Sequence, residues 1–258
     1  MKKSKSVIYH ARSDAPILIW SVGKVGSSGV RRALKRAGGN VEHFHYLHPE
    51  NVEAVRASLI AAGRDLPASV LCQTAQLQAA LPFWIEGGDL KVIAGVREPI
   101  SRTISAFFQN YEILNNREAK AEAQILKAFT QPGRYDVCLN WFDNELRTVL
   151  GFDVYNHAFD RHRLIKTYRF NNVDFLIYRI DASDSDLEAA ISKFTKIDVN
   201  LIPSNKASDK SYAEAYKYVR ENIVFEKDLL DKIFNSKYCK HFWTVSELAD
   251  IKSRWKIA

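Results

Sequence analysis

Cysteine is scarce in this chain of 258 residues, and its three cysteines stand far apart at Cys72, Cys138 and Cys239. No Cys-x-x-Cys pair occurs, so the spacing gives no indication of a zinc site or a dithiol redox centre. No uninterrupted apolar run approaches the ~20 residues that a helix needs to cross a bilayer. Polar residues interrupt the segment after the basic start Met1 to Lys5, which argues against a signal peptide. We therefore expect a cytoplasmic protein with reduced thiols and no membrane span.

Internal repeats, low-complexity tracts and long Pro/Gly/Ser linkers are also missing, so nothing in the composition marks a domain boundary. We expect a single domain over residues 1–258, with a core at about 16–245. The chain is 47% hydrophobic and 26% charged, which excludes intrinsic disorder and supplies enough apolar residues for a sizeable core. Its net charge of +7 favours anionic partners, with nucleotides, polyanions and nucleic acids all left open.

Buried parallel strands are indicated by near-continuous apolar runs rich in β-branched residues, which alternate with segments of helical periodicity. The strands are predicted at 16–22, 41–47, 68–73, 90–96 and 173–180, and the helices at 28–37, 51–62, from Pro99 onward, and at 117–130, 137–150, 185–194 and 212–234. Alternation of strands and helices is typical of an α/β fold in which a parallel sheet lies between two layers of helices. The sequence therefore predicts a three-layer α/β protein.

The loop from Gly23 to Ser28 connects the first predicted strand to the first predicted helix. Its small residues leave backbone N–H groups accessible, and the helix N-terminus adds partial positive charge, so an anion such as phosphate fits there. In a Walker A loop the lysine follows the second glycine, whereas Lys24 precedes Gly26. A conventional ATPase loop is therefore disfavoured, and an ordinary tight turn with an exposed lysine is the alternative.

A second candidate anion site lies at Arg97, which ends the strand at 90–96, with Ser105 eight residues later in the following helix. The carboxyl ends of parallel strands meet at one edge of the sheet, where open α/β sheets bind ligands. We therefore expect this site and the Gly23–Ser28 loop to share one ligand.

Two segments resemble the signatures of sulfotransferases that use 3′-phosphoadenosine 5′-phosphosulfate (PAPS). Lys24-Val25-Gly26-Ser27-Ser28 resembles their 5′-phosphosulfate loop, and Arg97-Glu98-Pro99 through Ser105 resembles their 3′-phosphate signature, in the same order. The segments 141–146 and 151–155 resemble bacterial sulfotransferase-like proteins associated with capsular polysaccharide synthesis. The resemblance extends over about residues 17–242 and implies a P-loop-NTPase-like sulfotransferase fold.

The resemblance also implies roles for individual residues. Val25, Gly26, Ser27 and Ser28 would bind the 5′-phosphate, Arg97 and Ser105 would bind the 3′-phosphate, and Lys24 would stabilise the leaving oxygen. The late residues Asn205, Lys206, Lys210, Ser211 and Tyr212 are similar to a basic segment that closes over the nucleotide, which makes Lys210 a candidate cofactor-binding residue. The product would be 3′-phosphoadenosine 5′-phosphate (PAP), and the chemistry requires no metal. The tryptophan that eukaryotic members carry after the two hydroxyl residues is replaced by Gly29 and Val30, so the residue that stacks on adenine stays unassigned.

A sulfotransferase needs a base that accepts the proton of the acceptor hydroxyl group. His43, His45 and His48 lie at or after the second predicted strand, and histidine has a suitable pKa range. We favour His45 as the catalytic base, because it lies nearer the sheet edge than His43 on the same strand face. Glu42 and Glu53 are weaker candidates.

The leading hypothesis is a PAPS-dependent sulfotransferase acting on a glycan or another hydroxyl-bearing acceptor, without nucleic acid as a partner. A P-loop nucleotide kinase is a second hypothesis, although it leaves the position of Lys24 unexplained. A non-catalytic polyanion-binding protein is a third, suggested by the basic residues Arg31, Arg32, Lys35 and Arg36. These four lie on a helix whose other face is apolar, so a solvated helix face explains them as well.

Overall fold

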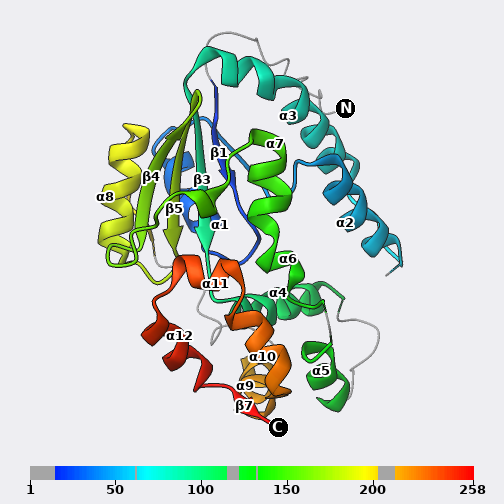
Figure 1. The fold of residues 1–258 in the computed structure, drawn as a ribbon. Helices are drawn as coiled ribbons and strands as arrows, with labels where there is room; N and C mark the ends of the chain where they lie inside the picture. The colour runs from blue at the N-terminus through cyan, green and yellow to red at the C-terminus, as the bar shows by residue number, and fades with distance from the viewer. Residues whose placement is uncertain (1–14, 62, 115–121, 132, 203–212) are drawn as a thin grey trace.

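The computed structural model describes residues 15–61, 63–114, 122–131, 133–202 and 213–258. Its main feature is a five-stranded sheet in the order β2-β1-β3-β5-β4 (Figure 1). The strands are β1 (Ile17–Trp20), β2 (Val41–Phe44), β3 (Leu90–Val96), β4 (Ile165–Phe170) and β5 (Val173–Arg179). Four of them run parallel, which confirms the predicted α/β class, whereas β4 pairs antiparallel with β5.

The edge strand β4 was not predicted, and it makes the sheet mixed rather than wholly parallel. Its exposed side chains, Lys166, Thr167 and Arg169, give it the polar composition of an edge strand. Strand β2 is also shorter than the predicted 41–47, because the backbone leaves the sheet after Phe44.

Helices surround the sheet. They are α1 (Ser27–Arg36), α2 (Pro49–Ala61), α3 (Ala68–Gly87), α4 (Pro99–Leu114), α5 (Glu122–Phe129), α6 (Asp136–Leu139), α7 (Thr148–Leu150), α8 (Asp184–Thr195), α9 (Ala213–Asn222), α10 (Lys227–Phe234), α11 (Lys237–Phe242) and α12 (Val245–Lys252). A π-helical turn, η1 (Asp143–Arg147), precedes α7, a short 3₁₀ turn, η2 (Val154–Asn156), follows it, and β6 (Val224–Phe225) pairs with β7 (Lys256–Ile257).

Two predicted elements were wrong. The predicted strand at 68–73 is the start of α3, whose buried residues Thr74, Leu77, Leu81 and Trp84 recur at helical spacing. A short apolar run does not distinguish a strand from a buried helix, which explains the error. The predicted helix at 212–234 is divided into α9 and α10, because residues 224–225 form β6 between them.

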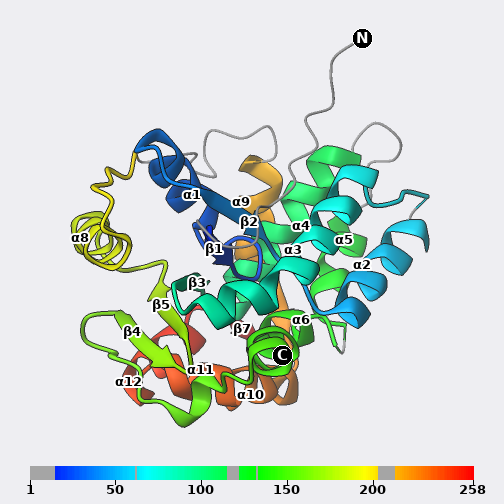
Figure 2. The same cartoon turned by 90° about the horizontal axis from the view of Figure 1, so that it is seen from above.

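Both faces of the sheet are covered, as the three-layer prediction requires. On one face, Ile19, Ile93 and Leu176 pack with buried residues of α1 and α8. On the other face, the strands contribute to a larger core shared with α3, α4, α6 and the C-terminal helices. Figure 2 shows α1 and α8 on one side of the sheet, with α3, α4 and α6 on the other.

The strand order determines where a ligand can bind. From β1 the chain continues through α1 to β2 on one side, whereas β3 lies on the other side of β1 and leads on to β5. The connections after β1 and β3 therefore diverge, and open α/β sheets bind ligands in the crevice at such a switch point. The Gly23–Ser28 loop follows β1 and Arg97 follows β3, so both predicted motifs lie at this edge.

Candidate functional site

The loop between β1 and α1 has an unusual backbone conformation. Lys24 has φ +75° and Gly26 has φ +82°, both in the left-handed region that non-glycine residues rarely adopt. Gly26 is the N-cap of α1, and no side chain of the described residues caps this helix. Within this turn Gly29 N–H donates to Gly26 O at 2.9 Å, so the N–H groups of Ser27 and Ser28 are the ones that can bind an anion.

Three side chains from other parts of the fold donate hydrogen bonds to three successive carbonyl groups of this loop. Arg102 Nε donates to Gly23 O at 2.9 Å, Arg97 Nη1 donates to Lys24 O at 3.1 Å, and Tyr178 Oη donates to Val25 O at 3.0 Å. The donors come from α4, from the end of β3 and from β5. These three hydrogen bonds offset the cost of the left-handed residue Lys24 and fix the loop in one conformation.

Ser27 contacts a histidine. His43 Nε2 and Ser27 Oγ lie 3.0 Å apart, and the Ser27 side chain is buried, whereas Ser28 is exposed. Burial, together with the neighbouring His45 and Arg31, lowers the pKa of His43 to about 4, so its ring is neutral at pH 7. When His43 Nε2 carries the proton, it donates to Ser27 Oγ and leaves the Ser27 hydroxyl hydrogen available for a ligand.

His45 lies beside the same loop. Its Nδ1 is 2.7 Å from Ser21 O, and since a carbonyl oxygen only accepts, Nδ1 carries the proton and Nε2 is the acceptor of the neutral ring. A Cβ built on Gly23 would lie 3.3 Å from His45 Nε2, so this nitrogen faces the loop. Burial lowers the pKa of His45, while its hydrogen bond to Ser21 acts in the opposite direction. The arrangement is that of a neutral imidazole with its basic nitrogen at the loop.

The other candidate bases contact different parts of the fold. The His48 backbone N–H donates to Glu145, Glu42 accepts a 2.6 Å hydrogen bond from Gln73, and Glu53 is exposed on α2 beside Arg56. The structure thus brings His43 and His45 to the loop.

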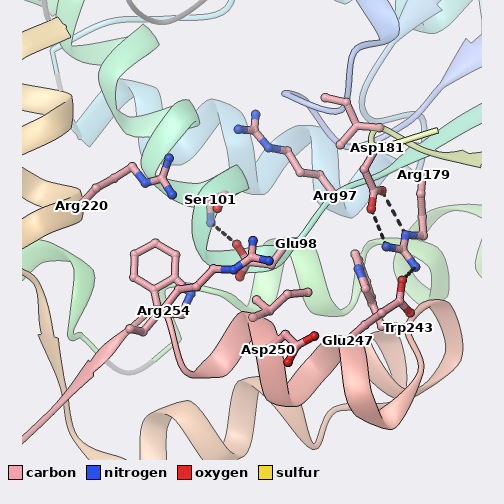
Figure 3. Close-up of a pocket in the computed structure, with 13 residues that line it drawn as sticks. Arg97, Glu98, Ser101, Arg179, Asp181, Arg220, Trp243, Glu247, Asp250 and Arg254 are labelled. Carbon is pink, nitrogen blue, oxygen red and sulfur yellow. Dashed lines mark hydrogen bonds and ion pairs between the residues drawn. The ribbon is translucent and has the colours of Figure 1, made fainter. Parts of the chain in front are cut away.

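Arg97 connects the two predicted anion sites. Besides binding Lys24 O, it lines a cavity of about 320 Å³ at the carboxyl ends of β3 and β5 (Figure 3). Tyr238 Oη fixes the backbone of Arg97, since it accepts from Arg97 N at 3.2 Å and donates to Arg97 O at 3.0 Å. Arg179 of β5, Arg220 of α9 and Arg254, which follows α12, line the same cavity, so four guanidinium groups border it.

Arg179 and four carboxylates complete the charged lining of this cavity. The buried Arg179 forms ion pairs with Asp181 and Glu247. Glu98 accepts two 2.7 Å hydrogen bonds from backbone N–H groups of the first turn of α4, and Asp250 contributes one further carboxylate.

Among the described residues, Arg97, Arg220 and Arg254 form no ion pair with a carboxylate. Three cationic side chains without such partners around one cavity suit an anionic group.

The predicted binding residue Ser105 is not part of this lining. Ser105 lies half-buried on α4, and the cavity is lined instead by Ser101, one turn earlier. Lys210 and the neighbouring predicted residues Asn205, Lys206, Ser211 and Tyr212 lie outside the described residues.

Sequence reasoning missed Arg102, Arg220 and Arg254. Arg102 could have been found as the second arginine of the segment that follows β3. Arg220 and Arg254 belong to no motif, and only the folded chain brings them to Arg97.

No curated protein and no solved structure matches the chain. Within the described residues, no helix is long and apolar enough to span a membrane, and no cluster of His, Cys, Asp or Glu has the composition of a metal site. Residues 120–244 match the NKWYS family, described as "Putative capsular polysaccharide synthesis protein", which is consistent with a biosynthetic, glycan-related role.

Proposed function

We propose that this protein is a sulfotransferase that transfers a sulfuryl group from PAPS to a hydroxyl group of a glycan. The proposal includes a P-loop-NTPase-like sulfotransferase fold formed by one domain. The similarity of residues 120–244 to a family of capsular polysaccharide synthesis supports a carbohydrate acceptor. The donor assignment is argued from the two anion sites.

The observation that carries the proposal is the position of Arg97 between these sites. Its guanidinium binds the carbonyl of Lys24 and also lines the cavity that Arg220 and Arg254 border. One ligand with two separated anionic groups could therefore contact the loop with one group and the arginine cavity with the other. PAPS has this property, because its 5′-phosphosulfate and its 3′-phosphate lie on opposite sides of the ribose.

The proposed reaction breaks the bond between sulfur and the 5′-phosphate oxygen of PAPS and forms a bond between sulfur and the acceptor oxygen. The loop amides and Lys24 stabilise the negative charge that develops on the leaving oxygen. His45 Nε2 accepts the proton of the acceptor hydroxyl group. In this mechanism the protein supplies positioning and charge, and it requires no bound metal.

The first experiment is calorimetric binding of PAP, compared with AMP and with ATP plus Mg²⁺. We expect metal-independent binding of PAP that is much tighter than that of AMP, because AMP lacks the 3′-phosphate. Loss of a hydrogen bond to a charged group costs ~1.5–3 kcal/mol, so Arg220→Ala and Arg254→Ala should each weaken PAP binding about 10- to 150-fold. Arg163→Ala, which removes an exposed arginine that does not line the cavity, is the matched control. Equal affinity for PAP and AMP, or a preference for Mg²⁺-ATP, would refute the proposal.

The second experiment measures transfer of labelled sulfate from PAPS to a panel of polysaccharides. Removal of a group aimed at developing charge typically costs ~2.7–4 kcal/mol of barrier, so Lys24→Ala should lower kcat by about 10²–10³ while PAP affinity changes little. Lys35→Ala removes an exposed lysine of α1 and should retain full activity. A Lys24→Ala protein with unchanged kcat would show that Lys24 has no catalytic role.

A further inference from the structure

The short segment from His45 to His48 has left the sheet, and side chains rather than strands bind its backbone. Trp141 Nε1 donates to His45 O at 2.8 Å, and Gln78 Nε2 donates to Leu47 O at 2.6 Å. The N–H groups of Leu47 and His48 donate to Glu145 Oε2 at 2.7 and 3.2 Å. These contacts fix the backbone of the segment that carries His45.

Glu145 is the centre of this arrangement. Its side chain is fully buried at 0% exposure, and besides the two backbone groups it accepts from Trp20 Nε1 at 3.1 Å and from Asn51 Nδ2 at 2.6 Å. A carboxylate is costly to bury, and its four donors offset that cost. Because all four must converge on two oxygen atoms, Glu145 determines the relative positions of β1, of the segment after β2 and of α2.

The helical segment that carries Glu145 is itself irregular. Glu145 lies in the π-helical turn η1, and π-turns are frequent at functional sites. Trp141 lies four residues before Glu145, so both side chains leave the segment on the same side. The Trp141 ring also packs edge-on against Trp20, with ring centroids 6.4 Å apart.

These contacts reach both partners of the hydrogen bond that sets the tautomer of His45. The acceptor is Ser21 O, and Ser21 directly follows Trp20, which Glu145 binds. The donor is His45 Nδ1. Trp141 binds the backbone carbonyl of His45, and Glu145 binds the backbone N–H of Leu47, two residues later.

We infer that Glu145, together with Trp141, is a positioning residue that fixes the His45–Ser21 hydrogen bond and thereby presents Nε2 of a neutral His45 to the phosphate-binding loop. The catalytic consequence rests on the proposed function, whereas the tautomer of His45 does not. Of the ionisable groups near His45, Arg102 favours the same neutral state. Arg102 of α4 lowers the pKa of His45, and His43 on β2 lies with its ring centroid 5.2 Å from that of His45.

The test begins with ¹⁵N NMR of the imidazole rings at pH 7 in the full-length protein. The wild-type His45 should have a protonated Nδ1 and an unprotonated Nε2. Glu145→Gln retains the shape of the side chain but has one oxygen and no charge. Three donors converge on Oε2 and Asn51 donates to Oε1, so the variant loses an acceptor for one group and binds the remaining donors more weakly. We expect this variant to show a mixture of His45 tautomers. Trp141→Phe, which removes the donor to His45 O together with part of the buried indole ring, should shift the ¹⁵N signals of His45 in the same direction.

The second readout separates positioning from a merely structural role. A misplaced base costs up to ~100-fold in rate, so Glu145→Gln should lower kcat by that order and shift the pH profile while PAP affinity stays within about twofold. Glu221→Gln, an exposed residue of α9, is the control and should change neither readout. If Glu145→Gln or Trp141→Phe reduces thermal stability but leaves the His45 tautomer and kcat unchanged, the inference is wrong. Failure of the proposed function would appear differently, as a wild-type protein that neither binds PAP nor transfers sulfate.

Discussion

Gly95 near the end of the central strand β3 supports the Gly23–Ser28 loop by having no side chain. A Cβ built there would lie 2.7 Å from Val25 Cγ2, 2.8 Å from Val25 O and 2.9 Å from Tyr178 Cζ. Glycine weakens a strand interior and often marks the close approach of another backbone. Here the approaching backbone is the loop, so we predict that Gly95→Ala displaces it.

The size of the effect follows from these contacts. The Val25 carbonyl cannot retreat easily, because Tyr178 Oη binds it at 3.0 Å. Overpacking of this kind destabilises the folded state by ~1–3 kcal/mol. Alanine also lowers the conformational entropy of the unfolded chain, which offsets ~0.4–1 kcal/mol of that loss. The net loss of stability should be roughly 1–2 kcal/mol. In a chain of this length each kcal/mol lowers Tm by ~2–4 °C, which predicts a fall of roughly 2–8 °C.

The assay is urea and thermal unfolding followed by circular dichroism. Gly87→Ala is the matched control, because a Cβ at Gly87, the last residue of α3, meets no atom within 4 Å. Because alanine lowers the conformational entropy of the unfolded chain, this control should be as stable as the wild type, or ~0.4–1 kcal/mol more stable. If Gly95→Ala is as stable as Gly87→Ala, the loop does not pack on β3 in the way described.

Two further predictions concern titratable side chains. Cys72 is exposed, while burial raises the pKa of Cys138 to about 11 and of Cys239 to about 12. One thiol per native chain should therefore react rapidly with Ellman's reagent and three after unfolding, and rapid reaction of all three in the native state would contradict the structure. Burial lowers the pKa of both His43 and His241 from 6.5 to about 4. The folded state then binds fewer protons than the unfolded state across this interval, so stability should fall as pH drops from about 6.5 towards 4. His241→Gln should reduce that fall when Tm is measured against pH, and an unchanged slope would count against the burial of this ring.

The sequence predicted correctly those helices and strands whose own residue pattern is sufficient to identify them. The strand Leu90–Val96 was predicted with its exact bounds, because a buried parallel strand has a continuous apolar run on both faces. Pro99 marked the start of α4 because its fixed φ suits the first helical turn. Strand β4 was missed because an edge strand that is mostly exposed carries no such run. The interruption between α9 and α10 depends on the pairing of Val224 with Lys256, a contact that local periodicity does not contain.

The candidate site divides in the same way. The loop and Arg97 could be located because both follow parallel strands. The carboxyl ends of parallel strands lie at the same edge of the sheet, independently of how the helices pack. Arg220 and Arg254 could not be located, since each lies more than a hundred residues from Arg97 and reaches the cavity only through the packing of the C-terminal helices. Glu145 was also missed. A charged residue within a helical pattern is normally expected to be exposed to solvent, and its four hydrogen-bond donors come from residues distant in the sequence.

The segment similar to the NKWYS family and the two candidate anion-binding motifs occupy different parts of the chain, yet their contacts make them interdependent. The Gly23–Ser28 loop, His45 and Arg97 precede the matched residues 120–244. Within the matched segment, Tyr238 binds the backbone of Arg97, and Glu145 with Trp141 fixes the segment that carries His45. The matched segment therefore positions a candidate anion-binding residue and the candidate base, although it contains neither. Substitutions in this segment should therefore alter the geometry of the site although they change no residue of either motif. A shortened chain without residues 120–244 would lack the contacts that hold Arg97 and His45 in place.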